Sequence, residues 1–100
     1  MNHEILILYV RQGCCLCEAL EEHLRNIPLN ALAPSLSLSV IDIDGAEATE
    51  KERKRYSLEV PVMVINSREQ SRKIEIPRAS PRLKSELLFS WLQKILEKIY

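Results

Sequence analysis

The sequence predicts an α/β fold in which a four-stranded mixed sheet carries helices on both faces. An uninterrupted apolar run at 5–10 has the length of a strand and no alternation, as in strands that are covered on both faces. Segments with apolar residues at three- and four-residue steps alternate with further strand-like segments. The resulting order is β-α-β-α-β-β-α, so we expect the first two strands to be parallel with a right-handed crossover and the last two to form a hairpin.

The first half of the chain supplies a strand, a helix and a second strand. Arg11-Gln12-Gly13 interrupts the apolar run, and a helical pattern then starts at Cys15 and is ended by Pro28. The apolar positions of this helix are Leu16, Ala19, Leu20, Leu24 and Ile27. Residues 28–36 form a linker with two prolines, and 36–44 alternates between apolar and polar residues as a strand does.

The second half supplies a helix, a hairpin and a final helix. Asp44-Gly45-Ala46-Glu47 resembles a capping box and predicts a helix over about 46–56. Strands are predicted at 62–65 and 72–76, separated by a polar turn. Ser80-Pro81 predicts the start of the last helix, with proline at the first helical position. The apolar positions of that helix are Leu83, Leu87, Leu88, Trp91, Leu92, Ile95, Leu96 and Ile99.

The composition restricts the class of protein. The chain has 100 residues, enough for a single domain over 1–100, and it is 46% hydrophobic and 28% charged with a formal net charge of zero. That balance argues against a nucleic-acid or membrane-surface protein, and no segment reaches the roughly 18 consecutive apolar residues of a membrane span. The start of the chain lacks the features of a signal peptide, so we expect a cytoplasmic monomer.

The stretch Gly13-Cys14-Cys15-Leu16-Cys17 is the candidate functional site. A Cys-x-x-Cys at a strand-to-helix junction is typical of a dithiol/disulfide redox centre, because residues three apart at a helix start lie on one face within disulfide distance. The helix amino terminus stabilises a thiolate on Cys14, and Arg11 adds positive charge. Cys14 is therefore the expected nucleophile and Cys17, one turn further in, the shielded resolving cysteine.

Two other interpretations of the cysteines stay open. Cys15 does not pair easily with an adjacent cysteine, so it is either a small apolar residue or a third thiol that exchanges partners. The cluster as a whole could also be inert or bind a metal. Zinc takes four ligands, and only His3 and His23 could supplement the cysteines. His3 lies at the opposite end of the first strand and His23 lies on another side of the helix, so we predict no metal site.

Val60-Pro61 is the second informative feature. A proline at the entry of a strand rich in β-branched residues needs a reason. In combination with the Cys-x-x-Cys motif, we expect a cis peptide bond that presents the Val60 backbone to the redox site.

Together these features resemble the glutaredoxin branch of the thioredoxin superfamily over nearly the whole chain. The closer resemblance is to small glutaredoxin-like proteins with a Gly-Cys-x-Leu-Cys motif, here Gly13 to Cys17. It implies a thioredoxin-like fold and thiol–disulfide exchange started by Cys14. It also implies a substrate lying along Val60 and Pro61. Arg11 and Gln12 complete the candidate substrate-binding residues.

The partners implied are protein or small-molecule disulfides, with no bound cofactor and with glutathione as a possible co-substrate. Pro77-Arg78-Ala79-Ser80 replaces the Gly-Gly-x-Asp pattern that holds glutathione in typical glutaredoxins. Ser80 with the helix start, aided by Arg78 or Arg82, could still receive a carboxylate. The alternative function is a thioredoxin-fold binding module that uses the cysteines for a metal or an iron–sulfur cluster, or an interaction domain without turnover.

Overall fold

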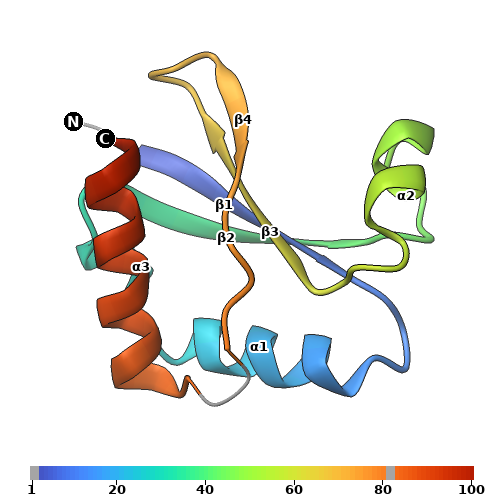
Figure 1. Ribbon diagram of the computed structural model, residues 1–100, viewed down its shortest axis with the longest axis horizontal. Coiled ribbons are helices and arrows are strands. Elements are labelled where there is room, and N and C mark those ends of the chain that lie inside the picture. The colour runs from blue at the N-terminus through green and yellow to red at the C-terminus, as the bar shows by residue number, and fades with distance from the viewer. Residues whose placement is uncertain (1–2, 81–82) are drawn as a thin grey trace.

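The computed structural model describes residues 3–80 and 83–100 and contains one mixed four-stranded sheet in the order β2-β1-β3-β4 (Figure 1). Strand β1 pairs in parallel with β2 and antiparallel with β3, and β3 pairs antiparallel with β4. The strands are β1 His3–Val10, β2 Ser35–Asp42, β3 Val62–Ser67 and β4 Arg72–Glu75. The parallel pair and the hairpin are both confirmed.

Helices cover both faces of the sheet, as the sequence predicts. Helices α1 and α3 pack on one face, and the short helix α2 lies on the other. The helices are α1 Cys15–Arg25, α2 Glu50–Tyr56 and α3 Ser85–Ile99, with a 3-10 turn at Leu29–Ala31 between α1 and β2. No helix in the described part of the chain has the length and apolarity needed to cross a membrane.

The apolar run in β1 is buried on both sides because side chains alternate across a strand. Leu6 and Leu8 are fully buried against α1 and α3, where they meet Leu24 of the first helix. Leu88, Leu92 and Leu96 of α3 complete this core, and each is 0% exposed. Ile7 and Tyr9 face the opposite way, and the rings of Tyr9 and Tyr56 stack with centroids 5.1 Å apart. The central strand therefore anchors the helices of both layers.

The predicted start of α2 was wrong by several residues. The helix begins at Glu50, and its capping box is formed by Thr49 and Glu52 rather than by Asp44 and Glu47. The amide N–H of Glu52 donates to the Thr49 hydroxyl at 3.1 Å, and the Thr49 N–H donates to the Glu52 carboxylate at 2.9 Å. Asp44 lies well ahead of the first helical residue, and its carboxylate binds Arg11 instead.

The other helix boundaries also differ from the prediction. Helix α3 begins at Ser85, after Leu83 and Lys84, so the predicted start at Ser80-Pro81 was wrong; Pro81 and Arg82 themselves lie outside the described residues. Helix α1 ends at Arg25 with Asn26 as its C-cap, slightly ahead of the predicted end at Pro28.

The strand boundaries are closer to the prediction. The second strand covers Ser35–Asp42 instead of 36–44, the third runs on to Ser67, and the fourth stops at Glu75. These shifts move no side chain of the candidate site.

Candidate redox site

The loop between β1 and α1 sets the position of Cys14. Gly13 adopts a left-handed backbone conformation with φ +81°, which side chains disfavour. The N–H of Cys14 then donates to the Arg11 carbonyl at 3.1 Å and closes the turn. Cys14 becomes the N-cap residue of α1, at the carboxyl end of the central strand. The sequence thus places the first cysteine on the tip of the helix.

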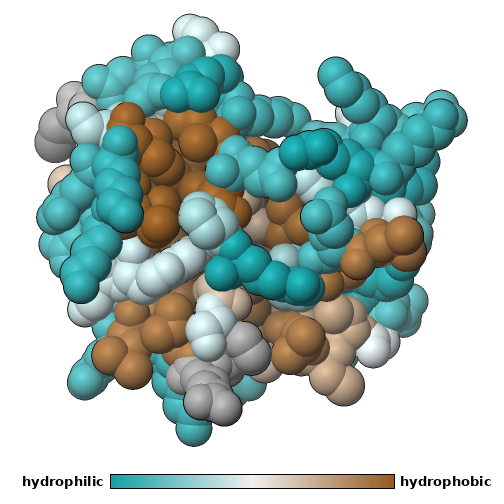
Figure 2. Space-filling model, viewed as in Figure 1, coloured by the Kyte–Doolittle hydropathy of each residue, from teal (hydrophilic) through white to brown (hydrophobic). Residues whose placement is uncertain are grey.

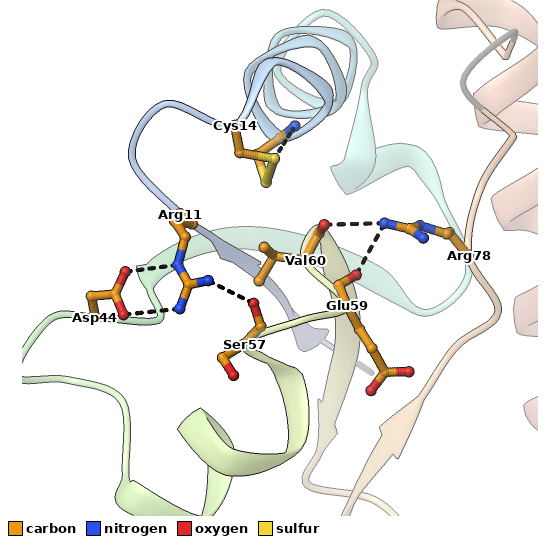
Figure 3. Close-up of a disulfide and its surroundings, with 8 residues drawn as sticks. Arg11, Cys14, Asp44, Ser57, Glu59, Val60 and Arg78 are labelled. Carbon is orange, nitrogen blue, oxygen red and sulfur yellow. Dashed lines mark hydrogen bonds and ion pairs between the residues drawn. A yellow bond between two sulfur atoms is a disulfide. The ribbon is translucent and has the colours of Figure 1, made fainter.

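Cys14 and Cys17 form a disulfide, with their Cα atoms 5.2 Å apart (Figure 3). This confirms the predicted pairing distance. The two sulfurs differ in access: Cys14 is half-buried, whereas Cys17 is only 1% exposed. The amide N–H of Cys17 points at the Cys14 sulfur with an N···S distance of 3.1 Å. The outer sulfur therefore receives both a hydrogen-bond donor and the positive end of the α1 dipole.

Cys15 is a free, exposed cysteine beside the disulfide. The two histidines lie elsewhere. His3 bonds the hydroxyls of Ser35 and Ser37 at the far end of the sheet, and His23 lines a pocket on α1. Within the described ranges, no group of three His, Cys, Asp or Glu side chains is arranged to hold a metal ion.

The Val60–Pro61 peptide bond is cis, as the sequence predicts, and Val60 lies next to the disulfide (Figure 3). Both backbone groups of Val60 are engaged within the protein. Its N–H donates to the Tyr56 carbonyl at 3.1 Å, and its carbonyl accepts from the Arg78 guanidinium at 3.0 Å. A second cis bond, between Ala33 and Pro34, was not predicted.

Arg11 fastens the redox loop to the α2 layer. Its guanidinium binds the Asp44 carboxylate at 2.8 and 3.1 Å and the Ser57 carbonyl at 2.8 Å. The hydrogen bond between the two side chains raises the pKa of Arg11 and lowers the pKa of Asp44. The positive charge that the sequence suggested for Cys14 is therefore already matched by a carboxylate. Gln12 is exposed in the same turn, and its side chain bonds no other described residue.

A small, mainly apolar pocket of about 80 Å³ lies next to the Cys-x-x-Cys segment, which it touches through Leu16. It lies between α1, the cis proline and the segment before α3. Leu16, between the two bonded cysteines, is 52% exposed at this pocket. Apolar side chains are visible over the lower part of the molecule in Figure 2, where α1 and the start of α3 lie. The lining residues are Leu16, Ala19, Leu20, His23, Pro61, Arg78, Ala79, Ser80 and Leu83.

Arg78 is the residue of this site whose contacts the sequence did not indicate. It follows β4 and binds the carbonyls of Glu59 and Val60 at 3.1 and 3.0 Å. The expected carboxylate site formed by Ser80 and a helix amino terminus was wrong, because α3 begins only at Ser85. Arg82, the other candidate, lies outside the described residues. Two basic residues, Arg78 and Arg82, were predicted to aid that carboxylate site. Only Arg78 is described by the structure, and it binds the carbonyl of Val60, next to the disulfide.

The sheet order, the disulfide on the tip of α1 and the cis proline beside it together fit a redox-active thiol protein with a thioredoxin-like fold. The chain belongs to the family described as "Glutaredoxin-like domain (DUF836)", whose model matches residues 5–93. A solved structure described as "Structure of a malarial protein" superposes with a TM-score of 0.61 at 16% identity, covering 95% of this chain and 99% of that one. No curated protein matches the sequence.

Proposed function

We propose that this protein is a thiol–disulfide oxidoreductase in which Cys14 is the nucleophile and Cys17 the resolving cysteine. The observation that carries the proposal is the unequal access of two sulfurs that are close enough to bond. Cys14 reaches the surface at the tip of α1, whereas Cys17 is 1% exposed directly behind it. A substrate disulfide can therefore meet only the first sulfur, and the second completes the reaction from inside.

The reaction balances with two thiols and one disulfide. The Cys14 thiolate attacks one sulfur of a substrate disulfide, forms a mixed disulfide and releases the other sulfur as a thiolate. The Cys17 thiolate then attacks the Cys14 sulfur and releases the second substrate thiolate. The substrate gains two electrons and takes two protons from solvent, and the protein is left with the Cys14–Cys17 disulfide. An external thiol returns it to the dithiol by the same steps in reverse.

The local geometry explains why the reduced form would be reactive. A thiolate on Cys14 replaces the N-cap oxygen of an ordinary helix and accepts the N–H of Cys17. Unpaired N–H groups and the helix dipole favour negative charge at that point, and the thiolate is the attacking species. Arg11 holds the loop in place through Asp44 and Ser57, so its contribution is positional.

The substrates we propose are protein or small-molecule disulfides, with glutathione as a possible reductant. The apolar pocket beside Leu16 and Pro61 supports a substrate with a non-polar group near its cysteine. No cofactor is needed for the exchange itself, because both electrons come from the cysteine pair. We expect the protein to act as a monomer in the cytoplasm.

Redox titration with thiol trapping tests this function. The protein is equilibrated in dithiothreitol buffers of stepped potential, alkylated, and measured by intact mass and peptide mapping. We expect loss of two thiols in one transition, with Cys14 alkylated faster than Cys17 in the reduced state. Cys17→Ser should accumulate a mixed disulfide on Cys14, and Cys15→Ala serves as the matched control with an intact pair. Two independent thiols, or pairing through Cys15, would overturn the assignment.

A further inference from the structure

We infer that the outer edge of β2 is a docking surface for a second copy of this chain, which pairs with it through its own β2 in antiparallel orientation. This edge lies outside the redox site, and the proposed function leaves it unused. Three properties of β2 point to a second copy: its unpaired backbone groups, its lack of charge and its self-complementary side chains.

One edge of β2 presents backbone groups without partners. β2 is an end strand of the sheet and, among the described strands, it pairs with β1 alone. The N–H of Ile43 donates to the Val10 carbonyl at 2.8 Å, so the odd-numbered residues of β2 direct their N–H and C=O groups toward β1. Because these directions alternate along a strand, the groups of Leu36, Leu38 and Val40 point outward. No other residue that the structure describes forms a hydrogen bond with them.

An extended chain is the partner that matches such a row. Donors and acceptors repeat along a strand edge at a fixed interval, and a neighbouring strand supplies the complementary groups at the same interval. A small ligand or a single side chain satisfies one of these groups and leaves the others unpaired. The occupant of this edge is therefore another strand.

The edge of β2 also lacks the features by which proteins prevent such pairing. Edge strands are usually short, charged or interrupted by proline. The opposite edge fits this rule, because β4 has four residues and three of them are Arg72, Lys73 and Glu75. β2 has eight residues, and none of residues 27–41 carries a charge. One edge of the sheet is thus protected by charge, whereas the other is open.

The backbone selects one register for the pair. In an antiparallel pair, residues whose groups point outward lie opposite one another and exchange both hydrogen bonds. A two-fold axis at Leu38 pairs Leu38 with its own copy and Leu36 with Val40, so all three outward-pointing residues are used. Pro34, which has no N–H, and Asp42, which is charged, then fall at the ends of the paired stretch.

The side chains agree with this register on both faces of the sheet. On the face covered by α1 and α3, the half-buried Leu38 lies against its copy, and the half-buried Val40 lies against the buried Leu36. On the other face, Ser37 of each copy lies opposite Ser39 of the other. Apolar side chains meet apolar ones, hydroxyls meet hydroxyls, and no like charges are brought together. This self-complementarity favours a second copy over an unrelated strand.

The pair is closed and leaves both redox sites accessible. Self-pairing occupies the same edge in both copies, and the charged β4 edge ends the continuous sheet β4-β3-β1-β2-β2-β1-β3-β4 on each side. Since β1 is parallel to β2, the two β1 strands run in opposite directions, and the two Cys14 residues lie at opposite ends of that sheet. A single strand pair is a small interface, so the association is reversible and each copy acts alone in dilute solution.

Sedimentation velocity tests whether the pair forms. All samples carry Cys15→Ala, so that the exposed thiol cannot join two copies covalently. From about 10 μM to about 1 mM, we expect the sedimentation coefficient to rise from the monomer value toward the dimer value and no further. Ser39→Lys places a cation in the middle of the edge and should weaken the association at least about tenfold. Ser90→Lys adds the same charge at an exposed position of α3 and is the matched control, which should associate normally.

Val40→Pro tests the backbone without adding charge. Proline removes one outward N–H and leaves the bonds from β2 to β1 in place, as an edge strand allows. It should weaken the association as Ser39→Lys does. Circular dichroism and the reduction of 2-hydroxyethyl disulfide show that each variant is folded. If Val40→Pro does not fold, the lysine variant and amide exchange still decide the question.

Amide exchange measured by nuclear magnetic resonance locates the interface. The odd-numbered residues 37–41 already donate to β1, so their amides should exchange slowly at every concentration. The amides of Leu38 and Val40 should exchange fast in dilute protein and slowly in concentrated protein. This alternation along one strand is specific to pairing at its edge.

A protein that stays monomeric at about 1 mM would overturn the inference and leave the edge to a different chain. Slow exchange of Leu38 and Val40 in dilute protein would also overturn it, because the edge would then be covered within one copy. A dimer that Ser39→Lys does not weaken would form through another surface. Assemblies that grow beyond two copies would contradict a closed pair.

Discussion

The two ends of the central strand use polar groups in opposite ways. At the start of β1, Glu4 is only 2% exposed, yet its carboxylate accepts the Tyr100 hydroxyl at 2.7 Å and the Arg68 backbone N–H at 3.1 Å. Burial alone would raise the pKa of Glu4, but hydrogen bonds from Ser67, Tyr100 and the backbone lower it overall. Tyr100 is thereby tied to the first strand, and the end of α3 lies beside the start of β1 (Figure 1).

At the other end of β1, the charged side chains are more exposed, and one of them, Arg78, has donors that bond to no described residue. Arg11 and Asp44 have side chains that are 35% and 52% exposed. Arg78 is also exposed, and two of its three nitrogens bond to no described residue. Cys14 reaches the surface between them (Figure 3). This end of the sheet can therefore accept new partners without breaking a buried network.

The two ends of β1 therefore have different roles: the end at Glu4 stabilises the fold, and the end at Cys14 carries the reactive groups. A buried carboxylate with all its donors in place costs much to disturb and offers nothing to a ligand. Exposed charges contribute little to stability but remain available for binding. Substitutions near Glu4 should therefore change the free energy of unfolding and spare activity, and substitutions near Cys14 should do the reverse.

The largest effect is expected for Cys14→Ser. The reduction of 2-hydroxyethyl disulfide should fall by at least about 100-fold, because a hydroxyl does not form the nucleophilic anion at neutral pH. Serine is a good N-cap residue and can accept the Cys17 N–H, so the urea midpoint of the reduced protein should stay the same or rise slightly. Retained dithiol activity in this variant would show that the outer sulfur is not the nucleophile.

Glu4→Ala is the counterpart at the other end of the strand. It leaves the Tyr100 hydroxyl and the Arg68 N–H without their acceptor, and the free energy of unfolding should fall by about 3 kcal/mol. The rate of disulfide reduction should be unchanged under conditions where the variant is folded. Glu47→Ala, at an exposed turn position, is the control and should have almost no effect. A Glu4 variant that loses activity while remaining folded would contradict the separation.

The sequence predicted features that depend on neighbouring residues. The apolar run of β1, the Cys-x-x-Cys spacing and the proline at the entry of β3 each have a local physical meaning, and all three are confirmed. Helix ends were harder because several residues near each end could serve as caps. Asp44 and Thr49 are both good N-cap residues, and only the folded structure shows that Arg11, 33 residues earlier, takes the carboxylate of Asp44.

Contacts between distant residues could not be predicted from one sequence. Glu4 and Tyr100 are 96 residues apart, and Arg78 reaches carbonyls 18 and 19 residues before it. Their partners are a phenol and backbone oxygens, which carry no pattern that marks them in advance. The same limit applies to the second cis bond at Pro34, which has no accompanying motif. The sequence therefore predicted the cysteines and the cis proline of the site but not the hydrogen bonds that hold the residues around them.

Acid should weaken the fold through carboxylates whose pKa is lowered by their hydrogen bonds, and Glu52 is the clearest case. Burial raises the pKa of Glu52, but bonds from Tyr9, Thr49 and Lys73 outweigh it and lower the pKa to about 2. A carboxylate with a lowered pKa stabilises the fold above its unfolded value of 4.5, and that contribution is lost as the pH falls toward 2. We expect the free energy of unfolding to drop by up to about 3 kcal/mol over this range through Glu52 alone.

Urea unfolding at stepped pH measures this loss. Glu4 has the same sign, because its pKa is also lowered, so it should add to the slope. Glu52→Gln should flatten the curve between pH 5 and about 2. Glu47→Gln is the matched control for an exposed carboxylate and should leave the curve unchanged. An identical slope in native protein and Glu52→Gln would show that this carboxylate is not held by its partners.

Tyr100→Phe makes a smaller change in the same buried network. It removes a single hydroxyl that donates to Glu4, and the free energy of unfolding should fall by about 1 kcal/mol. Burial and the nearby carboxylate raise the pKa of Tyr100 to about 12, so ultraviolet titration should show one high-pH tyrosine transition fewer in the variant. A Tyr100→Phe protein as stable as the native one would mean that the chain end is held by packing alone.

The smallest effect on stability is expected for the exposed ion pair between Arg11 and Asp44, at the redox end of β1. Asp44→Asn removes the carboxylate but leaves Arg11 bonded to the Ser57 carbonyl, so the loop before Cys14 keeps one of its ties. Because both side chains are exposed, the urea midpoint should hardly move. A midpoint that falls sharply in Asp44→Asn would show that the ion pair, and not the bond from Arg11 to the Ser57 carbonyl, holds the loop before Cys14.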